Sequence, residues 1–576
     1  MLKYLKKYWY FCLLAPLFMF GEIAMDLWQP DMMSEIVDKG VLAADMDVII
    51  SIGVIMILLV LFGGFCGIMS GVFANLASQQ FANDLRKDLF RKIMNLSFQQ
   101  TDKISTGSLI TRLSNDVTQV ERMVMMAIRS VVRCSVMFVG GIFMLSRQSL
   151  RFALIAVCAL PIVVFLVFFF MKKASPLFKV VQQKLDGVNN VMQENVAGAR
   201  VVKAYVKEDY EMERFDDAND ALCEINLKVQ SILAFMGPCM NIVLNVCVVG
   251  ILYVGGITVK SGGGLTPGEI MASITYMAMI LNGVMFMANI FQTFTRAKAS
   301  ADRISEVLKE QEIIKDGEMT LDNEAMAKGQ VEFKDVSFTY PNSGGQPVLH
   351  HISFKVSRGE TLAIIGSTGS GKSSLVNLIP RFYDCTEGEV LVNGVNVKDH
   401  KLQDLREKIG IVLQKAELYS RSIEANIRWG KETATPWEIK NAAEIAQADD
   451  FICDTEYGYY TNVTEGGHSL SGGQKQRISI ARAVLKDPEI LIFDDSTSAL
   501  DLRTEANLYE ALKKASPDAT KIIIAQRIAS VKDADRIAVI ENGTIADIGT
   551  HEELMENSEY YREIYNSQLK GGVDVE

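Results

Sequence analysis

Positive charge is in deficit along this chain of 576 residues. It carries 58 lysines and arginines against 69 aspartates and glutamates, which gives a net charge of −11 at neutral pH. Nucleic-acid binding depends on clustered basic side chains, so this balance argues against a nucleic-acid partner. Cysteine pairing is also absent from the sequence. The nine cysteines include no C-x-x-C pair, which indicates free thiols and neither a disulfide framework nor a metal site.

Long apolar runs, in contrast, are abundant in the first half of the chain. Hydrophobic residues make up 49% of the sequence, and the mean hydropathy is +0.16. A helix needs about twenty apolar residues to cross a bilayer. Six stretches approach that length: Trp9–Gln29, Val48–Val72, Ile128–Leu145, Phe152–Met171, Ile232–Val259 and Ile270–Phe291. We therefore predict a multi-pass protein of the inner or plasma membrane.

Basic residues near the first span predict the orientation of the chain. Lys3, Lys6 and Lys7 precede this span, whereas the loop that follows it, residues 30–47, is acidic and contains only Lys39. Lysine and arginine are enriched on the cytoplasmic side of membrane proteins. With an even number of spans, we expect both termini to lie in the cytoplasm.

Two long connections between spans, residues 74–125 and 172–231, show helical periodicity with interleaved charges. This pattern predicts helices that continue beyond the membrane. The charge pattern does not distinguish hairpins that dock on another domain from hairpins that are only solvated.

Glu22 and Asp26 lie inside the first span, four residues apart and therefore on one helix face. An ionisable side chain at membrane depth suggests a functional role. One interpretation is that the two acids line a translocation cavity and attract polar or cationic compounds. The other is that both lie near the outer end of the span, where burial of a charge is less costly. The sequence leaves both interpretations open.

Two stretches in the second half of the chain carry its chemistry. Gly366–Ser373 fits the pattern G-x-x-x-x-G-K-[ST] without a mismatch and follows an apolar strand, as a phosphate-binding loop does. Leu470–Asp501 begins with LSGGQ and continues as a helical run. The apolar run Ile490–Phe493 then delivers Asp494 and Asp495 at the carboxyl end of a predicted strand. A Walker B aspartate holds magnesium at this position of a parallel sheet.

Together these motifs resemble those of half-transporters of the ATP-binding cassette (ABC) exporter family. The phosphate-binding loop alone would indicate only a nucleotide binder. LSGGQ followed by a strand, two acids and Ser498–Asp501 is far more specific. The resemblance implies an all-α transmembrane domain with six spans over residues 1–308 and a linker over residues 309–330. An α/β P-loop (RecA-like) nucleotide-binding domain with a helical subdomain would follow over residues 331–576.

The resemblance also implies coupling segments. In the family, the cytoplasmic extensions of the membrane helices end in short helices that contact the nucleotide-binding domains. Thr101–Gly107 and Tyr205–Tyr210 match the positions of those helices. We therefore expect one or both segments to dock on a nucleotide-binding domain.

ATP and Mg²⁺ are the cofactors that the resemblance implies. Lys372 would bind the β- and γ-phosphates, and Ser373, Gln414 and Asp494 would hold Mg²⁺. Ser471 would contact the γ-phosphate of ATP bound by a second subunit. The expected nucleotide-binding set, with Tyr340 as the aromatic that stacks on adenine, is Tyr340, Gly366, Ser367, Thr368, Gly369, Ser370, Gly371, Lys372, Ser373, Ser374, Ser471, Gly472, Gly473, Gln474 and Asp501. The expected catalytic set is Gln414, Asp495 and Gln526.

Two residues depart from the pattern of family members that hydrolyse ATP efficiently. Asp495 stands where they carry glutamate, and Gln526 stands where they carry the switch histidine. The shorter carboxylate would retreat from the attacking water, and such a misplacement can cost on the order of a hundredfold in rate. Glutamine cannot carry the charge of an imidazolium. Glu489 and His551 lie in other segments, so we expect neither to substitute. The site is predicted to bind ATP but hydrolyse it slowly.

An intact signature beside a weakened site predicts one subunit of a heterodimeric, multidrug-type exporter. Ser471 would complete the competent site of a partner half-transporter. The complex would move small hydrophobic or amphipathic compounds outward, in contact with membrane lipids. Two alternatives stay open: a homodimeric exporter or lipid flippase with modest ATPase activity, and a nucleotide-gated regulatory subunit without a transport cycle of its own.

Overall fold

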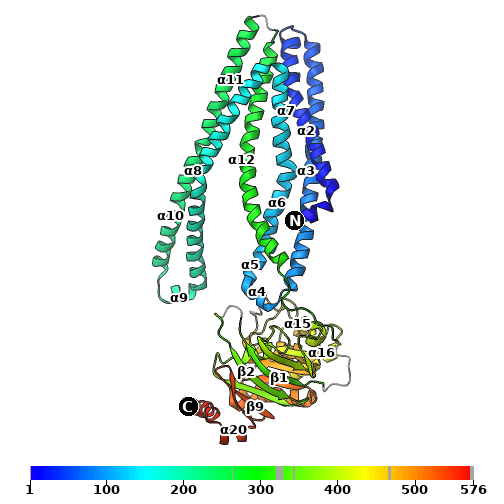
Figure 1. The fold of residues 1–576 in the computed structure, drawn as a ribbon, viewed down its shortest axis with the longest axis vertical. Helices are drawn as coiled ribbons and strands as arrows, with labels where there is room; N and C mark the ends of the chain where they lie inside the picture. The colour runs from blue at the N-terminus through cyan, green and yellow to red at the C-terminus, as the bar shows by residue number, and fades with distance from the viewer. Residues whose placement is uncertain are drawn as a thin grey trace. The chain divides into compact units, whose positions relative to one another are not determined.

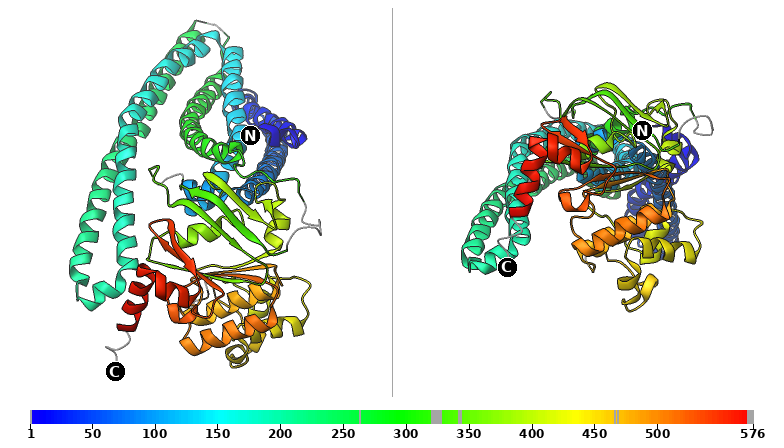
Figure 2. Two further views of the ribbon diagram at one scale, coloured as in Figure 1. Left: turned by 60° about the horizontal axis from the view of Figure 1, so that its bottom comes forward. Right: turned by 90° about the horizontal axis from the view of Figure 1, so that it is seen from below.

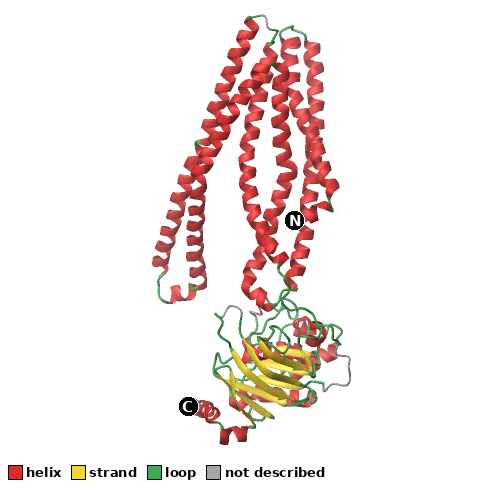
Figure 3. Ribbon diagram, viewed as in Figure 1, coloured by secondary structure: helices red, strands yellow, loops and turns green. Residues whose placement is uncertain are grey.

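A computed structural model describes residues 2–261, 264–319, 328–340, 344–464, 467 and 469–570. Contacts along the chain divide it into two compact units. The helical unit comprises residues 1–94 and 107–310, and the sheet unit comprises residues 95–106 and 311–576. Figure 3 shows helices throughout the first unit and strands flanked by helices in the second. The predicted order, a helical part followed by an α/β part, is confirmed.

The helical unit consists of long helices, because its apolar runs contain few residues that interrupt a helix. In chain order its elements are α1 (Leu2–Lys6), α2 (Trp9–Glu35), η1 (Ile36–Val41), α3 (Met46–Met94), α5 (Thr106–Thr111), η2 (Arg112–Asp116), α6 (Val117–Met126), η3 (Ala127–Val131), α7 (Val132–Gln148), α8 (Leu150–Ala197), α9 (Ala199–Ala204), α10 (Glu208–Ala234), α11 (Met236–Lys260) and α12 (Pro267–Lys309). The helices predicted over residues 74–125 and 172–231 are confirmed, since α3 and α8 continue well past their apolar segments (Figure 1).

Five helical segments are long and apolar enough to cross a membrane within the described part of the chain. They are Trp9–Val41, Met46–Met94, Thr106–Gln148, Leu150–Ala197 and Glu208–Lys260. Each contains one of the first five predicted spans. The sixth predicted span, Ile270–Phe291, lies on α12, and several of its side chains fall outside the described residues. The count of six spans therefore stays a prediction.

Two groups of helices make up the helical unit. α2 packs on α3, and α12 packs on α7, α2 and α6. α8 packs along α10 and α11, and Figures 1 and 2 show these helices side by side. Tyr276 of α12 is fully buried and donates its hydroxyl to the carbonyl of Leu27 in α2, at 2.8 Å.

The sheet unit contains two sheets. The four-stranded sheet has the order β2 (Leu349–Val356), β1 (Val331–Phe338), β4 (Glu387–Val392), β5 (Val395–Asn396), and its neighbours are antiparallel. The six-stranded sheet has the order β10 (Thr544–Gly549), β9 (Arg536–Glu541), β3 (Thr361–Gly366), β8 (Thr520–Ile524), β7 (Ile490–Asp494), β6 (Ile409–Val412). Its strands are parallel except β10. The adjacent strands β3, β8 and β7 therefore present their carboxyl ends at one edge, where ligands bind in open α/β sheets.

Helices surround these strands because the central strands are apolar on both faces. Every residue of β7 is buried, as the run Ile490–Phe493 predicts. The helices are α4 (Phe98–Ile104), α13 (Lys372–Asn377), α14 (Leu402–Glu407), α15 (Ile423–Arg428), α16 (Pro436–Ile445), α17 (Asp449–Cys453), α18 (Gly472–Leu485), α19 (Leu502–Ala515), α20 (His551–Asn557) and α21 (Glu559–Lys570), with 3₁₀ turns η4 (Gly458–Tyr460) and η6 (Ile528–Ser530). Helices α15, α16 and α18 pack on one another, in agreement with the predicted helical subdomain.

Candidate nucleotide site

The predicted phosphate-binding loop joins β3 to α13, and two glycines fix its path. A Cβ atom on Gly366 would lie 2.2 Å from the carbonyl oxygen of Ile540, so no larger residue fits there. Gly371 precedes α13 with a φ of 99°, a conformation that glycine adopts without steric cost. The loop backbone can therefore approach phosphate groups closely, as the motif requires.

The two reactive side chains at the end of this loop, Lys372 and Ser373, lie near Asp494 and Asp495 at the carboxyl end of β7. Ser373 donates its hydroxyl to Asp494 Oδ1 at 2.7 Å. Lys372 donates through Nζ to the carbonyls of Gly366 and Ser367, at 2.9 and 2.8 Å. Burial raises the pKa of Asp494, and the neighbouring Asp495 carboxylate adds to this effect. Burial lowers the pKa of Lys372, although both acids oppose that shift.

These residues suit a magnesium nucleotide better than a metal ion alone. No cluster of three or more His, Cys, Asp or Glu that could hold a metal occurs among the described residues. Mg²⁺ prefers hard oxygen ligands and is usually held by one or two carboxylates together with substrate phosphates. Asp494 and Ser373, in direct contact, supply such oxygens, and the Gln414 side chain lies beside the adjacent Asp495. When bound, Mg²⁺ would neutralise charge on the phosphates, and Lys372 would assist in that role.

Asp495 is held by both glutamines that the sequence analysis singled out. Its Oδ2 atom accepts hydrogen bonds from Gln526 Nε2 at 2.6 Å and from Gln414 Nε2 at 3.1 Å. Asp495 is buried, with a residue exposure of 6%, and its φ is 46°. The structure therefore brings together the three predicted catalytic residues. It also shows that one carboxylate oxygen already has two amide donors, which an attacking water would have to replace.

Glu489 and His551, the two candidates weighed from the sequence, do not replace the missing groups. Glu489 bonds to Lys408 at 2.8 Å and to Asn393 at 2.9 Å. The His551 ring contacts the Tyr561 hydroxyl at 2.6 Å, in α20 and α21. Both side chains are therefore engaged away from Asp495, as the sequence predicts.

The signature residues lie at the start of α18. Ser471 caps this helix by accepting from Gln474 N, and the Gln474 side chain accepts from Ser471 N. A Cβ atom on Gly473 would meet the Ala499 carbonyl at 2.9 Å, which explains the small residue. Within the described part of the chain, Ser471 and Gln474 bond to each other and not to the phosphate-binding loop. Asp501 caps α19 by accepting from Thr504.

Tyr340 lies beside the phosphate-binding loop. Its hydroxyl contacts Ser374 Oγ at 3.0 Å. Its ring meets those of Phe338 and Tyr383 edge-on, with centroids 4.7 and 5.3 Å apart. This position agrees with a role in adenine binding, and stacking on the base stays a prediction.

Comparisons with known proteins agree with this geometry. The model of the ABC transporter transmembrane region matches residues 12–285, and the ABC transporter model matches residues 349–498. The ABC transporter ATP-binding protein YfiB of Bacillus subtilis is 39% identical over 568 residues, 99% of this chain and 98% of that protein. The chain belongs to the ABC transporter family.

Further relatives extend this result. The ATP-dependent lipid A-core flippase of Desulfotalea psychrophila is 37% identical over 495 residues, 85% of each chain. A solved bacterial Atm1-family ABC exporter with ATP bound has the same fold, with a TM-score of 0.81 and 24% identity, over 96% of this chain and 98% of that one. This ABC transporter is thus a multi-pass half-transporter in which a helical transmembrane domain precedes an ATP-binding domain.

The first predicted coupling segment of this ABC transporter packs within the sheet unit. Residues 95–106 belong to that unit by their contacts. The Phe98 ring lies 4.7 Å from Phe382 and 6.4 Å from Tyr383 between centroids. The Tyr383 hydroxyl donates to Asp102 Oδ2 at 2.8 Å. Docking, and not mere solvation, therefore applies to Thr101–Thr106, whereas Gly107 belongs to the helical unit. The second predicted segment, Tyr205–Tyr210, belongs to the helical unit.

Replacing Tyr383 with phenylalanine should loosen the first coupling segment without displacing it. The change removes the hydroxyl that binds Asp102 and keeps the ring that packs on Phe98. One such hydrogen bond contributes about 0.5–1.5 kcal/mol. The rate of amide hydrogen exchange in residues 95–106 should therefore rise by the factor that corresponds to this free energy. Tyr340→Phe is the matched control, because it removes a neighbouring hydroxyl that contacts Ser374 Oγ. Equal exchange in Tyr383→Phe and the native chain would contradict the expectation.

An arginine pairs with both acids of the first span. Arg133 of α7 binds Glu22 Oε1 at 3.0 Å and Asp26 Oδ2 at 3.5 Å. A Cβ atom on Gly67 would lie 2.9 Å from the Glu22 carboxylate, so glycine lets α3 accommodate this side chain. Arg133 was not among the predicted site residues, although a charge inside the predicted span 128–145 is a signal in the sequence. The single positive charge of Arg133 therefore offsets only part of the charge of the two acids, and direct contact with substrate stays a hypothesis.

Arg133→Met should destabilise the helical unit. The Glu22 and Asp26 side chains are only 13% and 31% exposed, and the change leaves both carboxylates without this partner. Breaking a buried ion pair costs about 3–5 kcal/mol, and we expect the low end because Arg133 is partly exposed. Unfolding in detergent micelles measures the effect. Adding Glu22→Gln and Asp26→Asn should restore stability, whereas an unchanged midpoint for Arg133→Met alone would contradict this account.

Proposed function

We propose that this chain is one subunit of a two-chain ABC exporter with unequal ATP sites. Its own phosphate-binding loop holds ATP and turns it over slowly. Its signature, Ser471–Gln474, completes the faster site of a partner half-transporter that carries glutamate and histidine where this chain has Asp495 and Gln526. Energy from the partner's site would then drive most of the transport cycle.

The observation that carries this proposal is the environment of Asp495. The carboxylate belongs to a residue one methylene shorter than glutamate, and its Oδ2 atom is bonded to both Gln414 and Gln526. A general base must reach the water whose proton it accepts. A short carboxylate with two amide donors on one oxygen is poorly placed for that task. Gln526 can orient a phosphate oxygen but cannot supply positive charge.

The placement of the signature supports a site formed between two chains. Ser471 caps α18 and has exposed surface. Its hydroxyl and the backbone of the two glycines could therefore reach a γ-phosphate bound by another subunit. The turn between α9 and α10 also suits a partner, because Tyr205 and Val206 there are 73% and 82% exposed. These apolar side chains are accessible for contact with a partner.

The transported compounds are proposed to be small and hydrophobic or amphipathic. The relative from Desulfotalea psychrophila is named a flippase of lipid A-core. A 610 Å³ cavity between α2 and α7, lined by residues such as Phe20, Trp28 and Phe143, has an almost wholly apolar surface. Such a surface suits apolar groups of a substrate or of membrane lipids. With both termini in the cytoplasm, ATP binding would move compounds out of the cell.

Subunit composition tests the proposal directly. The tagged chain is purified in mild detergent from its native host, and the mass of the intact complex is measured. We expect a stoichiometric second half-transporter with glutamate and histidine at the two altered positions. A homodimer with robust ATPase activity would overturn the proposal and favour the homodimeric exporter or flippase. A complex that hydrolyses ATP with no dependence on any transported compound would favour the regulatory subunit.

A further inference from the structure

The chain passes between its two units at three points, and two of them lie next to an unusual cluster of buried charge. The crossings fall at residues 94/95, 106/107 and 310/311. The second crossing begins α5, and the third follows the end of α12. Movement in the sheet unit can reach the helical unit through these covalent connections.

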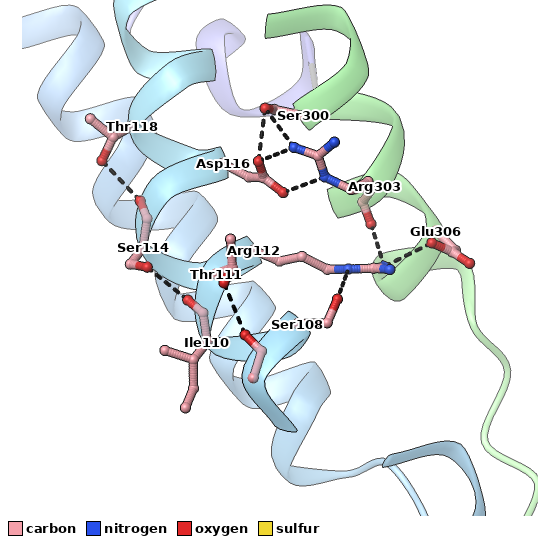
Figure 4. Close-up of polar contacts among 11 residues, drawn as sticks. Ser108, Ile110, Thr111, Arg112, Ser114, Asp116, Thr118, Ser300, Arg303 and Glu306 are labelled. Carbon is pink, nitrogen blue, oxygen red and sulfur yellow. Dashed lines mark hydrogen bonds and ion pairs between the residues drawn. The ribbon is translucent and has the colours of Figure 1, made fainter. Parts of the chain in front are cut away.

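Within the helical unit, several hydrogen bonds to one carboxylate join η2 to α12. Asp116 is 3% exposed and accepts from Arg303 Nε at 2.8 Å, from Arg303 Nη2, and from Ser300 Oγ at 2.8 Å. Figure 4 shows the carboxylate of Asp116 directed at the guanidinium of Arg303, with Ser300 above both. A bidentate pair of this kind fixes direction as well as distance.

A second arginine extends the cluster toward the crossings. Arg112, 8% exposed, donates through Nη1 to the carbonyl of Arg303 at 2.9 Å and to Glu306 at 2.8 Å. Its Nε atom donates to Ser108 at 3.4 Å. The turn η2 that carries both Arg112 and Asp116 is π-helical, a conformation that is rare and often found at functional sites.

On the side of the sheet unit, the same two segments are joined again. Gln100 is 1% exposed, and its Nε2 atom donates to the carbonyl of Gln311 at 2.7 Å. Gln100 is also held in a capping box with Ser97 at the start of α4. The coupling segment and the start of the linker are therefore joined within the sheet unit, just as η2 and α12 are joined within the helical unit.

We infer that Asp116 and Arg303 are positioning residues that make η2 and α12 move as one body when ATP acts. We call the Asp116–Arg303 pair the clamp. While this pair is intact, a displacement of the coupling segment 95–106 cannot shift α5 and α6 without also shifting α12. When the Asp116–Arg303 contact is broken, the sheet unit can still hydrolyse ATP, but η2 and α12 respond separately. The pair therefore couples ATP turnover to the movement of the membrane helices. This role differs from that of the coupling segment, which contacts the sheet unit itself.

The test compares ATP turnover with a conformational signal in the same complex. The native complex is reconstituted in nanodiscs of phosphatidylethanolamine and phosphatidylglycerol, with the exposed cysteines Cys158, Cys223 and Cys453 changed to serine. An environment-sensitive fluorophore on Leu42→Cys, an exposed site at the end of the first span, reports the change produced by ATP and vanadate. ATPase activity is measured in parallel, so that each variant yields a response per ATP hydrolysed.

Asp116→Asn, Arg303→Gln and their combination should keep most of the ATPase activity. Their fluorescence response per ATP hydrolysed should fall on the order of tenfold. This factor is within the usual range by which one site changes the affinity of another. The double variant should lose no more than either single variant, because both remove one shared contact. Arg303→Lys keeps the charge without the fork and should respond at an intermediate level. Lys298→Gln, an exposed change on the same helix, is the matched control and should respond normally.

Two results would overturn the inference. One is a normal fluorescence response per ATP hydrolysed in all the variants at Asp116 and Arg303. The other is a parallel loss of ATPase activity and response in Arg303→Lys, together with a lowered melting temperature, since that pattern indicates a purely structural support. If Asp116→Asn does not fold, Arg303→Lys and Arg303→Gln still decide between these outcomes.

Discussion

Ser471→Arg should nearly abolish ATP hydrolysis by the assembled complex, whereas Lys372→Met should leave most of it intact. Arginine at position 471 removes the hydroxyl and fills the space above the signature glycines. The partner's site would then lose a group that stabilises its transition state, and loss of one such donor costs on the order of a hundredfold or more. Lys372 serves only the slow site of this chain. Steady-state ATPase assays on the reconstituted complex measure both effects.

The asymmetry between these variants is the informative result. In a homodimer both changes would disable both sites, so equal loss would contradict the proposed function. Ser469→Arg is the matched control, since Ser469 is exposed and lies two residues before the signature serine. It introduces the same side chain outside the signature motif. The variant should therefore retain the activity of the native complex.

Asp495→Glu together with Gln526→His should convert the slow site into a fast one. The longer carboxylate would reach the attacking water, and the change at 526 would remove the amide that now donates to Asp495 Oδ2 at 2.6 Å. Restoring a misplaced base can recover on the order of a hundredfold in rate. The gain is measured in a complex whose partner site has been silenced. Asp495→Glu alone should gain less, because Gln526 would still hold the carboxylate.

Asp495→Asn with Gln526→His provides the control for this second prediction. It introduces the same histidine but no base, so the rate should stay low. A large gain in the control would show that the histidine alone limits turnover. No gain in Asp495→Glu with Gln526→His would show that the slow rate originates outside these two positions. Either result would require a different account of the site.

Much of the fold follows from patterns within short stretches of the chain. The apolar runs predicted the membrane helices because a bilayer demands a fixed length of apolar residues. The all-buried strand β7 and the loop after β3 followed from an apolar run and from glycines at fixed spacing. The convergence of Ser373 and Asp494 could also be expected, since the carboxyl ends of parallel strands meet at one edge of a sheet.

The sequence also identified where the nucleotide site departs from its family. Asp495 and Gln526 stand at motif positions, so their identity alone predicts a slow site. The structure added that Gln414 and Gln526 both donate to one oxygen of Asp495. That contact depends on the register of three strands, β6, β7 and β8, which no local pattern specifies.

Pairings between distant charges were decided only by the tertiary structure. Asp116 and Arg303 are 187 residues apart in sequence, and Asp102 and Tyr383 are 281 apart. Arg133 likewise joins α7 to α2. The chain contains 58 basic and 69 acidic side chains, so composition permits thousands of opposite-charge pairs. Helix and strand signals arise from neighbours along the chain. Which charges meet depends instead on the way in which the long helices cross and pack. The sequence alone thus determined the elements and the chemistry of the ATP site, and packing determined the contacts that could link that chemistry to the membrane helices.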